Sequence, residues 1–490
     1  MTNFYYLITK IPTSIIAIML FCAGVIGCST NEGEKNTDNF DVKTQEYGGG
    51  SDCTFNDSWF AGSDFPSEVD GGDFCDFQQF MWHAFTEVTK PSNTTGKLVF
   101  ETWMPTYGIF VGPGKQPSQW GSVPPNQCTT DPGDTKLMFT NLTKQAGVEQ
   151  PLIDQQGNKV YYGISLNETA YNFVTGCDLY KSECAAQLDG QLGGVDLIKK
   201  YPKLAFPDGS VELKSAWKQL TPTEISSGKF YKIEGLIQPD ANNPTQCETK
   251  TLGLVGLHIV AKTPNHPEFI WGTFEHENNA PDCTDLTPSA PIGDWTFFNS
   301  TTYNNCNSEY CTNHYQPNTP TQVCREHPYG DSNLGRYPNG NDCTVSPNQR
   351  ICQEDVKQDL TDNTTAIKAI NDSAETKFKT KSSVWANYFL TGNVWTSDGS
   401  AAAKGVVPPS QRSWSGSLSS ANLSMETYVQ NGQAGIMNPA NCFTCHSMVS
   451  ADGSPDLPPV GLSHIFHQLV PNTGGCETGN LPAICPIGGQ

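Results

Sequence analysis

The chain has 490 residues, and its 29 lysines and arginines against 50 aspartates and glutamates give a formal net charge of −21. This acidic balance, without any cluster of basic residues, argues against a nucleic-acid partner and against a face that binds anionic membranes. The 45 glycines and 34 prolines interrupt the chain too often for a helical bundle and favour strands and turns.

The first 27 residues have the pattern of an export signal. Lys10 supplies a positive charge, and residues 11–27 are mostly apolar but shorter than the roughly 20 residues that span a bilayer. This run ends in the sequence VIGC at residues 25–28, which resembles the bacterial lipobox. Cys28 is therefore expected to become the lipidated first residue of the mature chain, and the alternative is an ordinary secretory signal with a chance cysteine.

Residues 28–52 are polar and acidic, and they contain three consecutive glycines near their end. This composition buries too little apolar surface to order itself, so we expect a flexible tether. Serine follows Cys28, and in the usual lipoprotein sorting rule this favours the outer membrane, with the protein facing the periplasm or the cell surface. Because no second apolar run approaches membrane length, the lipid is expected to be the only membrane attachment.

The chain contains 18 cysteines, which favours an oxidising compartment outside the cytosol. Cys22 leaves with the signal and Cys28 takes the lipid. Cys442 and Cys445 belong to the motif described below. The remaining 14 are an even number and none lies in a CxxC pair, so disulfides are expected rather than zinc sites. Neighbours in the sequence give the expected local bridges, which are Cys53–Cys75, Cys177–Cys184, Cys343–Cys352 and Cys476–Cys485.

Residues 53–396 alternate short apolar runs with glycine, proline, asparagine and aspartate, which predicts an antiparallel, disulfide-rich β body. A strand is predicted at residues 97–104. Residues 251–262 are apolar on both faces, which predicts a central strand buried on both sides. Residues 353–380 lose the glycines and prolines and have helical spacing, so a helix is predicted there. The fold class is therefore α+β, predominantly antiparallel β.

A hairpin is expected to follow the central strand, with residues 263–267 as a five-residue loop and residues 268–276 as the returning strand. The register of this loop places His258 and His276 on the same side of the sheet and Glu275 on the other. The two histidines are then separated by about 13 Å along the strands. One ion cannot bridge that distance, so packing is favoured over a metal or catalytic role.

Residues 397–490 form the last segment, in which a linker of small residues at 397–410 precedes the sequence CFTCH at residues 442–446. C-x-x-C-H is the attachment sequence of c-type haem. On one helical turn Cys442 and Cys445 reach both vinyl groups of a porphyrin as thioethers, while His446 directs its imidazole at the iron. The prediction is one covalent haem c in a small, mainly helical segment; the alternative is a Cys442–Cys445 disulfide beside an idle histidine.

The second axial ligand of the iron is less evident, because Met448 is the last methionine and lies too close to His446 to reach the opposite face. His464 is the first candidate, since it follows a proline-rich turn at a distance that lets the chain fold over the haem. The ligand pair sets the redox potential, and a vacant position permits ligand binding or peroxide chemistry. The alternatives to His464 are His467, Met437, Met425, His83 from the body, and an open site.

Three segments together resemble a group of bacterial monohaem c-type cytochrome lipoproteins. They are CFTCH at residues 442–446, FETW at residues 100–103 and WGTFEHENNAP at residues 271–281. The first segment alone is mechanistically specific. The resemblance loosely covers most of the mature chain and implies haem binding and electron transfer, and it assigns neither a substrate nor the distal ligand.

These features predict an exported, lipid-anchored cytochrome c that passes single electrons to an unidentified redox partner. Two alternatives remain open. The size of the body favours a haem-dependent oxidoreductase of the peroxidase or oxygenase type, because electron shuttling alone needs a much smaller protein. The other alternative is a surface module that binds a ligand and carries an attached haem.

Overall fold

The computed structural model describes residues 52–62, 64–93, 95–112, 114–125, 128, 136–139, 145, 150–181, 201, 203–238, 246–286, 295–305, 312–330, 354–396, 399, 414–417, 419–430, 442–446, 459–463, 465–466 and 485. Only the backbone is described for residues 330, 354–361, 444–445, 459 and 461. Residues 46–490 form one compact unit. The expected signal peptide, Cys28 and the tether up to residue 51 lie outside the described residues. None of the described helices has the length and apolar character needed to cross a bilayer.

The described strands form one nine-stranded, mainly antiparallel sheet with the order β1-β3-β4-β6-β7-β8-β9. β5 pairs with β6, and β2 pairs with β5 in the one parallel pairing among the described strands. The fold class predicted from the sequence, an antiparallel β body within an α+β protein, is therefore confirmed. The strands are β1 Met104–Pro105, β2 Met138–Phe139, β3 Tyr161–Leu166, β4 Val211–Gln219, β5 Lys232–Ile237, β6 Glu248–Ala261, β7 Ile270–His276, β8 Tyr388–Thr396 and β9 Trp414–Gly416.

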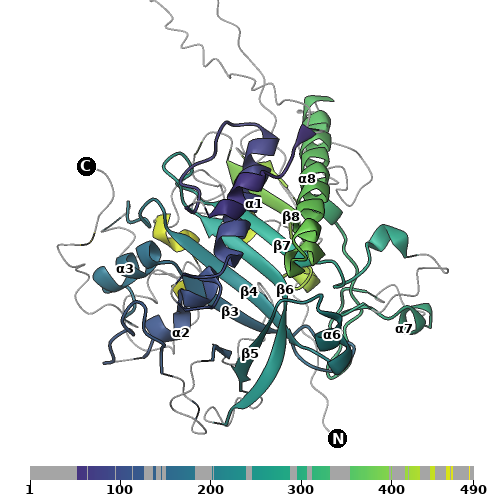
Figure 1. The fold of residues 1–490 in the computed structure, drawn as a ribbon, viewed down its shortest axis with the longest axis horizontal. Helices are drawn as coiled ribbons and strands as arrows, with labels where there is room; N and C mark the ends of the chain where they lie inside the picture. Colours follow the sequence, from purple (N-terminus) through teal and green to yellow (C-terminus); the bar gives the residue numbers. More distant parts are fainter. Residues whose placement is uncertain are drawn as a thin grey trace, which may run out of the picture. The chain divides into compact units, whose positions relative to one another are not determined.

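The described helices are mostly short, and two longer ones, α1 and α8, stand out (Figure 1). The α-helices are α1 Phe74–Thr89, α2 Thr106–Ile109, α3 Glu168–Gly176, α6 Pro222–Ser227, α7 Ser300–Asn304, α8 Glu354–Thr380 and α9 Cys442–Cys445. The 3-10 helices are η2 Asp57–Ala61, η3 Val99–Thr102, η4 Cys283–Asp285, η5 Pro328–Gly330, η6 Val384–Asn387, η8 Thr427–Val429 and η9 Pro459–Leu462.

One face of the sheet is covered by α1 and α8, and we call it the helix-covered face (Figure 1). Asp73 begins α1 with a capping box that includes Asp76, which satisfies backbone N–H groups of the first turn. Trp82 of α1 is fully buried against Phe274 of β7, with ring centroids 5.1 Å apart. The indole N–H of Trp82 donates to Asn371 of α8 at 3.1 Å, so the two helices and the sheet share one core.

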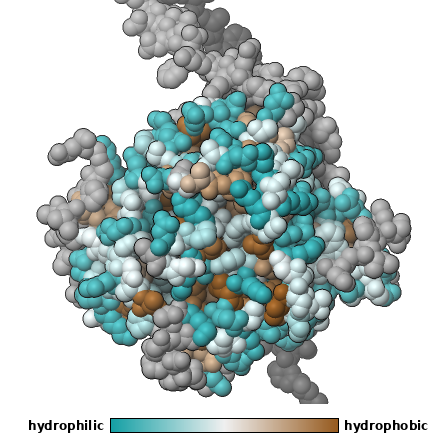
Figure 2. All heavy atoms as spheres, viewed as in Figure 1, coloured by the Kyte–Doolittle hydropathy of each residue, from teal (hydrophilic) through white to brown (hydrophobic). Residues whose placement is uncertain are grey.

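The opposite face is covered by loops and short helices, including segments from the C-terminal part of the chain, and we call it the loop-covered face. The side chains on this face come from alternate residues of β4, β6 and β7. Among the described residues, Val123 is the one large hydrophobic residue that is exposed, and the view in Figure 2 presents a mainly hydrophilic surface with smaller apolar areas. The members of the loop-covered face used below are Glu212, Lys214, Gly256, His258, Trp271, Thr273 and Glu275.

Two predicted elements are confirmed and one is wrong. The central strand predicted at residues 251–262 is β6, and the helix predicted at residues 353–380 is α8. The strand predicted at residues 97–104 is instead the 3-10 helix η3 followed by the two-residue β1. The carboxylate of Glu101 accepts a hydrogen bond from the backbone of Leu98 at 2.8 Å, and such local bonds compete with strand pairing.

The predicted hairpin forms, but its register differs by one residue from the expected one. Ala261 pairs with Ile270, so the loop has eight residues instead of five, and it includes Phe269 at a φ of 66°. His258 therefore pairs with Thr273 and shares its face with Glu275, while His276 faces the other side. The expectation that both histidines face one side and Glu275 the other is wrong, because a one-residue shift exchanges the faces of a strand.

Four disulfides join described cysteines: Cys53–Cys75, Cys128–Cys247, Cys177–Cys485 and Cys283–Cys324. The expected Cys53–Cys75 bridge is confirmed. The bridges expected between Cys177 and Cys184 and between Cys476 and Cys485 are wrong, because Cys177 bonds to Cys485 across 308 residues. The expected Cys343–Cys352 bridge lies outside the described residues.

Non-reducing peptide mapping of the mature protein is expected to recover peptides joined through Cys177 and Cys485. Replacing both residues with serine removes a cross-link that closes a long loop and should lower the free energy of unfolding by about 2–5 kcal/mol. Urea unfolding of the wild type and the double variant measures this difference. Recovery of a peptide pair joined through Cys476 and Cys485 would contradict the connectivity.

Candidate functional site

The segment Ala421–Gln430 is anchored directly on the loop-covered face. Gly256 permits this contact, because a Cβ atom there would lie 2.2 Å from the hydroxyl oxygen of Ser424. The Asn422 side-chain amide donates to the Thr273 hydroxyl at 2.8 Å and to the Phe274 carbonyl at 3.0 Å. A backbone N–H of the same segment, that of Leu423, donates to Glu275 at 2.8 Å. These bonds fix the segment over β6 and β7.

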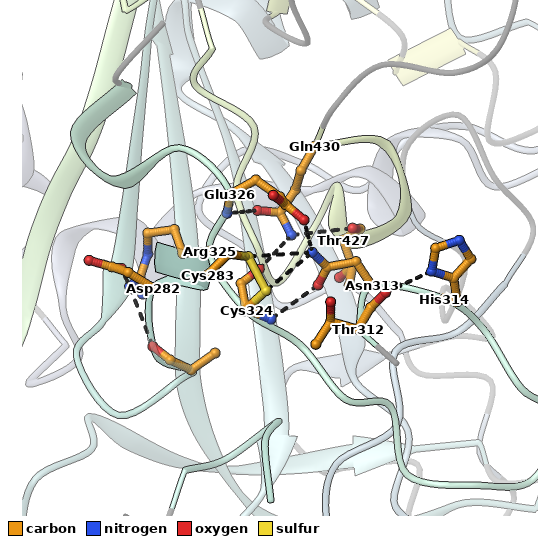
Figure 3. Close-up of a disulfide and its surroundings, with 11 residues drawn as sticks. Asp282, Cys283, Thr312, Asn313, His314, Cys324, Arg325, Glu326, Thr427 and Gln430 are labelled. Carbon is orange, nitrogen blue, oxygen red and sulfur yellow. Dashed lines mark hydrogen bonds and ion pairs between the residues drawn. A yellow bond between two sulfur atoms is a disulfide. The ribbon is translucent and has the colours of Figure 1, made fainter. Parts of the chain in front are cut away.

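The end of this segment, at Gln430, lies beside the Cys283–Cys324 disulfide. The Gln430 amide donates to the Cys324 carbonyl at 3.1 Å (Figure 3). Cys283, Cys324 and Glu326 bring three ligand-type atoms together. The two sulfurs are bonded to each other, so this group is a covalent cross-link and not a metal centre.

The first four residues of the CFTCH motif, residues 442–445, form α9. Phe443 is fully buried and contacts Trp414, with ring centroids 5.9 Å apart. It belongs to an apolar cluster with Val460, Leu462 and Phe466. The His446 N–H donates to the Cys442 carbonyl at 2.8 Å, so the helical turn continues to the histidine and brings these two residues to one face of the turn.

Leu462 and Trp271 both contact the His446 imidazole. Its Nδ1 lies 2.7 Å from the carbonyl oxygen of Leu462, and the Trp271 ring packs against its face with centroids 4.3 Å apart and an interplanar angle of 37°. Since a carbonyl only accepts, Nδ1 carries the proton and Nε2 carries the lone pair of the neutral ring. Burial lowers the pKa of His446 to about 4, and the charges of Lys214 and His258 act in the same direction.

Three charged or titratable side chains form a cluster close to this imidazole. Lys214 on β4 pairs directly with His258 on β6. Glu426, from the segment that covers the sheet, lies 3.1 Å from the Nε2 of His258 and 3.7 Å from the Nζ of Lys214. Burial raises the pKa of Glu426, but His258, Lys214 and the Asn422 N–H outweigh it, so the net shift is downward. Glu426 is therefore an ionised acceptor that holds His258.

Glu212 lies two residues before Lys214 on β4 and faces the same side. It is 7% exposed, and its carboxyl group interacts with Ser463 from the segment after η9. Its second oxygen, Oε1, has no hydrogen-bond partner among the described residues. Burial raises the pKa of Glu212 to about 7, with a smaller opposing contribution from Ser463. The loop-covered face thus carries a carboxyl group that is protonated in mildly acidic solution.

The structure brings together Cys442 and His446 of the predicted haem ligands. Cys445 is the last residue of α9, and its side chain is outside the described residues. The candidate distal ligands His464, His467 and Met437 also lie outside them.

The remaining candidates from the sequence make their described contacts outside the apolar cluster around α9. Met425 is buried in an apolar cluster with Leu423 and Val255. His83 lies on α1 over the helix-covered face and stacks on Trp59 with centroids 5.1 Å apart, on the other side of the sheet from the Trp271 ring that contacts His446. His276 stacks on Phe230, its Nε2 lies 3.1 Å from the Lys229 carbonyl, and burial lowers its pKa to about 3. These contacts give His276 a packing role.

Sequence reasoning missed Glu212, Lys214, Trp271 and Glu426 as members of the site. Alternation along β4 marks Glu212 and Lys214 as residues of one face. Their proximity to His446 depends on how β4, β6 and β7 pair, and no local pattern in the sequence carries that information.

The Glu212→Gln variant should remove one contribution to the pH dependence of stability. A pKa of about 7 in the folded state, above the ordinary value of 4.5, makes the folded protein bind the proton more tightly than the unfolded chain. Relative to the variant, the wild type should therefore lose roughly 2–3 kcal/mol more unfolding free energy between pH 5 and pH 8, with this difference levelling off above pH 7. Urea unfolding of both proteins at the two pH values measures the difference. Equal pH dependence in both would contradict it.

Comparison of the chain with known protein families, with curated proteins and with solved structures finds no match. The function of the site therefore follows from the chemistry of its own residues.

Proposed function

We propose that the protein is an exported, lipid-anchored monohaem c-type cytochrome that transfers single electrons, with Cys442 and Cys445 as the thioether residues and His446 as the proximal ligand. The observation that carries the proposal is the 2.7 Å contact between Nδ1 of His446 and the Leu462 carbonyl. A histidine that binds a metal commonly donates its other ring N–H to a carbonyl or carboxylate, which fixes the tautomer and orients the ring.

The position of the Trp271 ring is compatible with this role. Trp271 packs against the face of the His446 imidazole, whereas the lone pair of Nε2 lies in the plane of the ring and points from its edge. The residues present therefore fit a proximal ligand: the orientation is set by Leu462 and Trp271, and neither contact uses the coordinating electron pair.

The surroundings also suit a large apolar cofactor. Phe443, Val460, Leu462 and Phe466 form an apolar cluster around α9, and clusters of this kind exclude water. When bound, haem c supplies a one-electron iron couple whose potential depends on its axial ligands and on the polarity around it. The role of the chain is to attach the cofactor, orient His446 and limit access of water. In this proposal α9 and η9 belong to the small helical haem segment within residues 397–490.

A second candidate function is a haem-dependent oxidoreductase. Lys214, His258 and Glu426 place proton donors and acceptors on the face of the sheet that also contacts His446 through Trp271. Peroxide or oxygen chemistry requires such groups together with an open coordination position. Spectra with added carbon monoxide separate the two functions, because a carrier with two protein ligands does not bind it.

Replacing Cys442 and Cys445 with serine should abolish covalent haem attachment. Full-length protein matured in a host with haem-ligation machinery is expected to give a pyridine haemochrome and a mass increase of one haem in the wild type, and neither in the double variant. Serine at Cys53 and Cys75 is the matched control, because it removes two sulfurs from the helix-covered side and should retain the haem. A wild type without haemochrome absorbance would refute the proposal.

Replacing Cys28 with alanine should release the protein from the membrane fraction and prevent incorporation of labelled palmitate, because Cys28 is the proposed lipidated residue. Cys22→Ala removes a cysteine from the signal itself and is expected to leave the labelling unchanged. Labelling that persists in the Cys28 variant would refute the lipid anchor without bearing on the haem.

A further inference from the structure

We propose that Glu212, on β4, is a positioning residue for the proximal ligand His446, and that loss of its proton lowers the redox potential of the attached haem. The inference rests on the proposed function and deepens it, because it couples the transferred electron to a proton. When one electron arrives from the redox partner, the ionised Glu212 carboxylate takes up one proton from water and becomes neutral. When the electron leaves, the proton returns to water.

The first argument is that Glu212 and His446 contact consecutive residues. The carbonyl of Leu462, the last residue of η9, accepts from Nδ1 of His446 at 2.7 Å. The next residue, Ser463, is buried and donates a hydrogen bond to the carboxyl group of Glu212. A movement of Ser463 therefore also moves the carbonyl that sets the orientation of the His446 ring.

The second argument is the row of side chains across the sheet. Glu212 pairs with Val260 on β6, and Val260 pairs with Trp271 on β7, so the three residues lie at one level of the loop-covered face. Because neighbouring strands are about 4.8 Å apart, the Cα atoms of Glu212 and Trp271 are separated by about 10 Å. Trp271 packs against the His446 ring with centroids 4.3 Å apart. A charge on Glu212 is therefore near enough to act on the proximal side of the haem through the protein interior.

The third argument is the lack of a paired cation. The two nearest lysines are committed elsewhere, since Lys214 lies 3.7 Å from Glu426 and Lys262, directly after β6, lies 3.3 Å from Asp208. Oε1 of Glu212 has no hydrogen-bond partner among the described residues. Further titratable groups on the elements packed around Glu212 include His258 on β6, His446 after α9, and Glu168 and Tyr171 on α3.

The protonation state of Glu212 is therefore poised to respond to the iron. Burial raises the pKa of Glu212 to about 7, so both forms are populated near neutral pH. The ionised form adds a negative charge that favours oxidised iron, which lowers the potential. It also requires more solvation than the Ser463 hydroxyl supplies, so water is drawn between the sheet and the segment after η9. The neutral form keeps Ser463 and Leu462 packed on the sheet.

The first test is potentiometry of the matured, haem-loaded full chain between pH 5 and pH 9. The midpoint potential of the wild type should fall as the pH rises through the titration of Glu212. Glu212→Gln should keep the higher potential and lose this fall, whereas Glu212→Asp retains a carboxyl group and should keep a pH dependence. Glu234→Gln removes an exposed carboxylate from β5 of the same sheet, so it is the matched control and should resemble the wild type.

The second test does not need haem. In the full chain without haem, labelled with nitrogen-15 in its histidines, the ring signals of His446 are those lost in His446→Ala. They should shift around pH 7, although the pKa of His446 itself is about 4, and Glu212→Gln should remove this shift. Ser463→Ala removes the hydroxyl that lowers the pKa of Glu212, so it should move the transition to higher pH.

Two results would overturn the inference. One is an equal fall of potential with pH in the wild type and in Glu212→Gln, and the other is a His446 transition that Glu212→Gln leaves in place. If circular dichroism shows that Glu212→Gln does not fold, an unshifted transition in Ser463→Ala overturns it instead. A wild type without haemochrome absorbance refutes the proposed function, and the nitrogen-15 spectra then still decide whether Glu212 positions His446.

Discussion

The pairing of β4, β6 and β7 is the constraint on which the rest of the structure depends. Because side chains alternate between faces, this pairing sends Trp217, Leu257 and Phe274 towards α1 and α8 and directs Lys214 and His258 to the opposite side. The apolar residues make the core that stabilises the sheet. The polar residues place charged groups on the loop-covered face, and the C-terminal segments pack over these groups.

The C-terminal segments meet the sheet through specific polar bonds as well as apolar contacts. Hydrogen bonds of Asn422 and Glu275 fix the segment Ala421–Gln430 on the sheet. Apolar contacts around Phe443 hold α9. The buried Glu275 is also paired with Arg325 at 2.9 Å, so its charge is compensated inside the protein. Residues separated by well over a hundred positions in the chain thus define the surroundings of His446.

Local patterns in the sequence were sufficient for some of this architecture. β6 was recognisable because residues 251–262 carry apolar residues on both faces of the strand, and α8 because its apolar residues have helical spacing. The hairpin register was not predictable, because Phe269 adopts a left-handed backbone conformation that an aromatic residue rarely takes. The Cys177–Cys485 bridge depends on the tertiary fold, which sequence proximity does not report. In the candidate site, the CFTCH motif is visible in the sequence, and its role in haem attachment stays a prediction. That Glu212, Lys214 and Glu426 belong to the site could be seen only from the pairing of the strands.

The bridge between Cys177 and Cys485 changes the topology of the molecule near its end. With the bond formed, CFTCH is no longer part of a free tail but belongs to a covalent ring that starts after α3 and returns almost at the last residue. Unfolding that begins beyond Cys485 therefore meets this covalent bond before it reaches α9. Detachment of the motif from the sheet requires a whole internal loop to lift off together, which makes it a cooperative event.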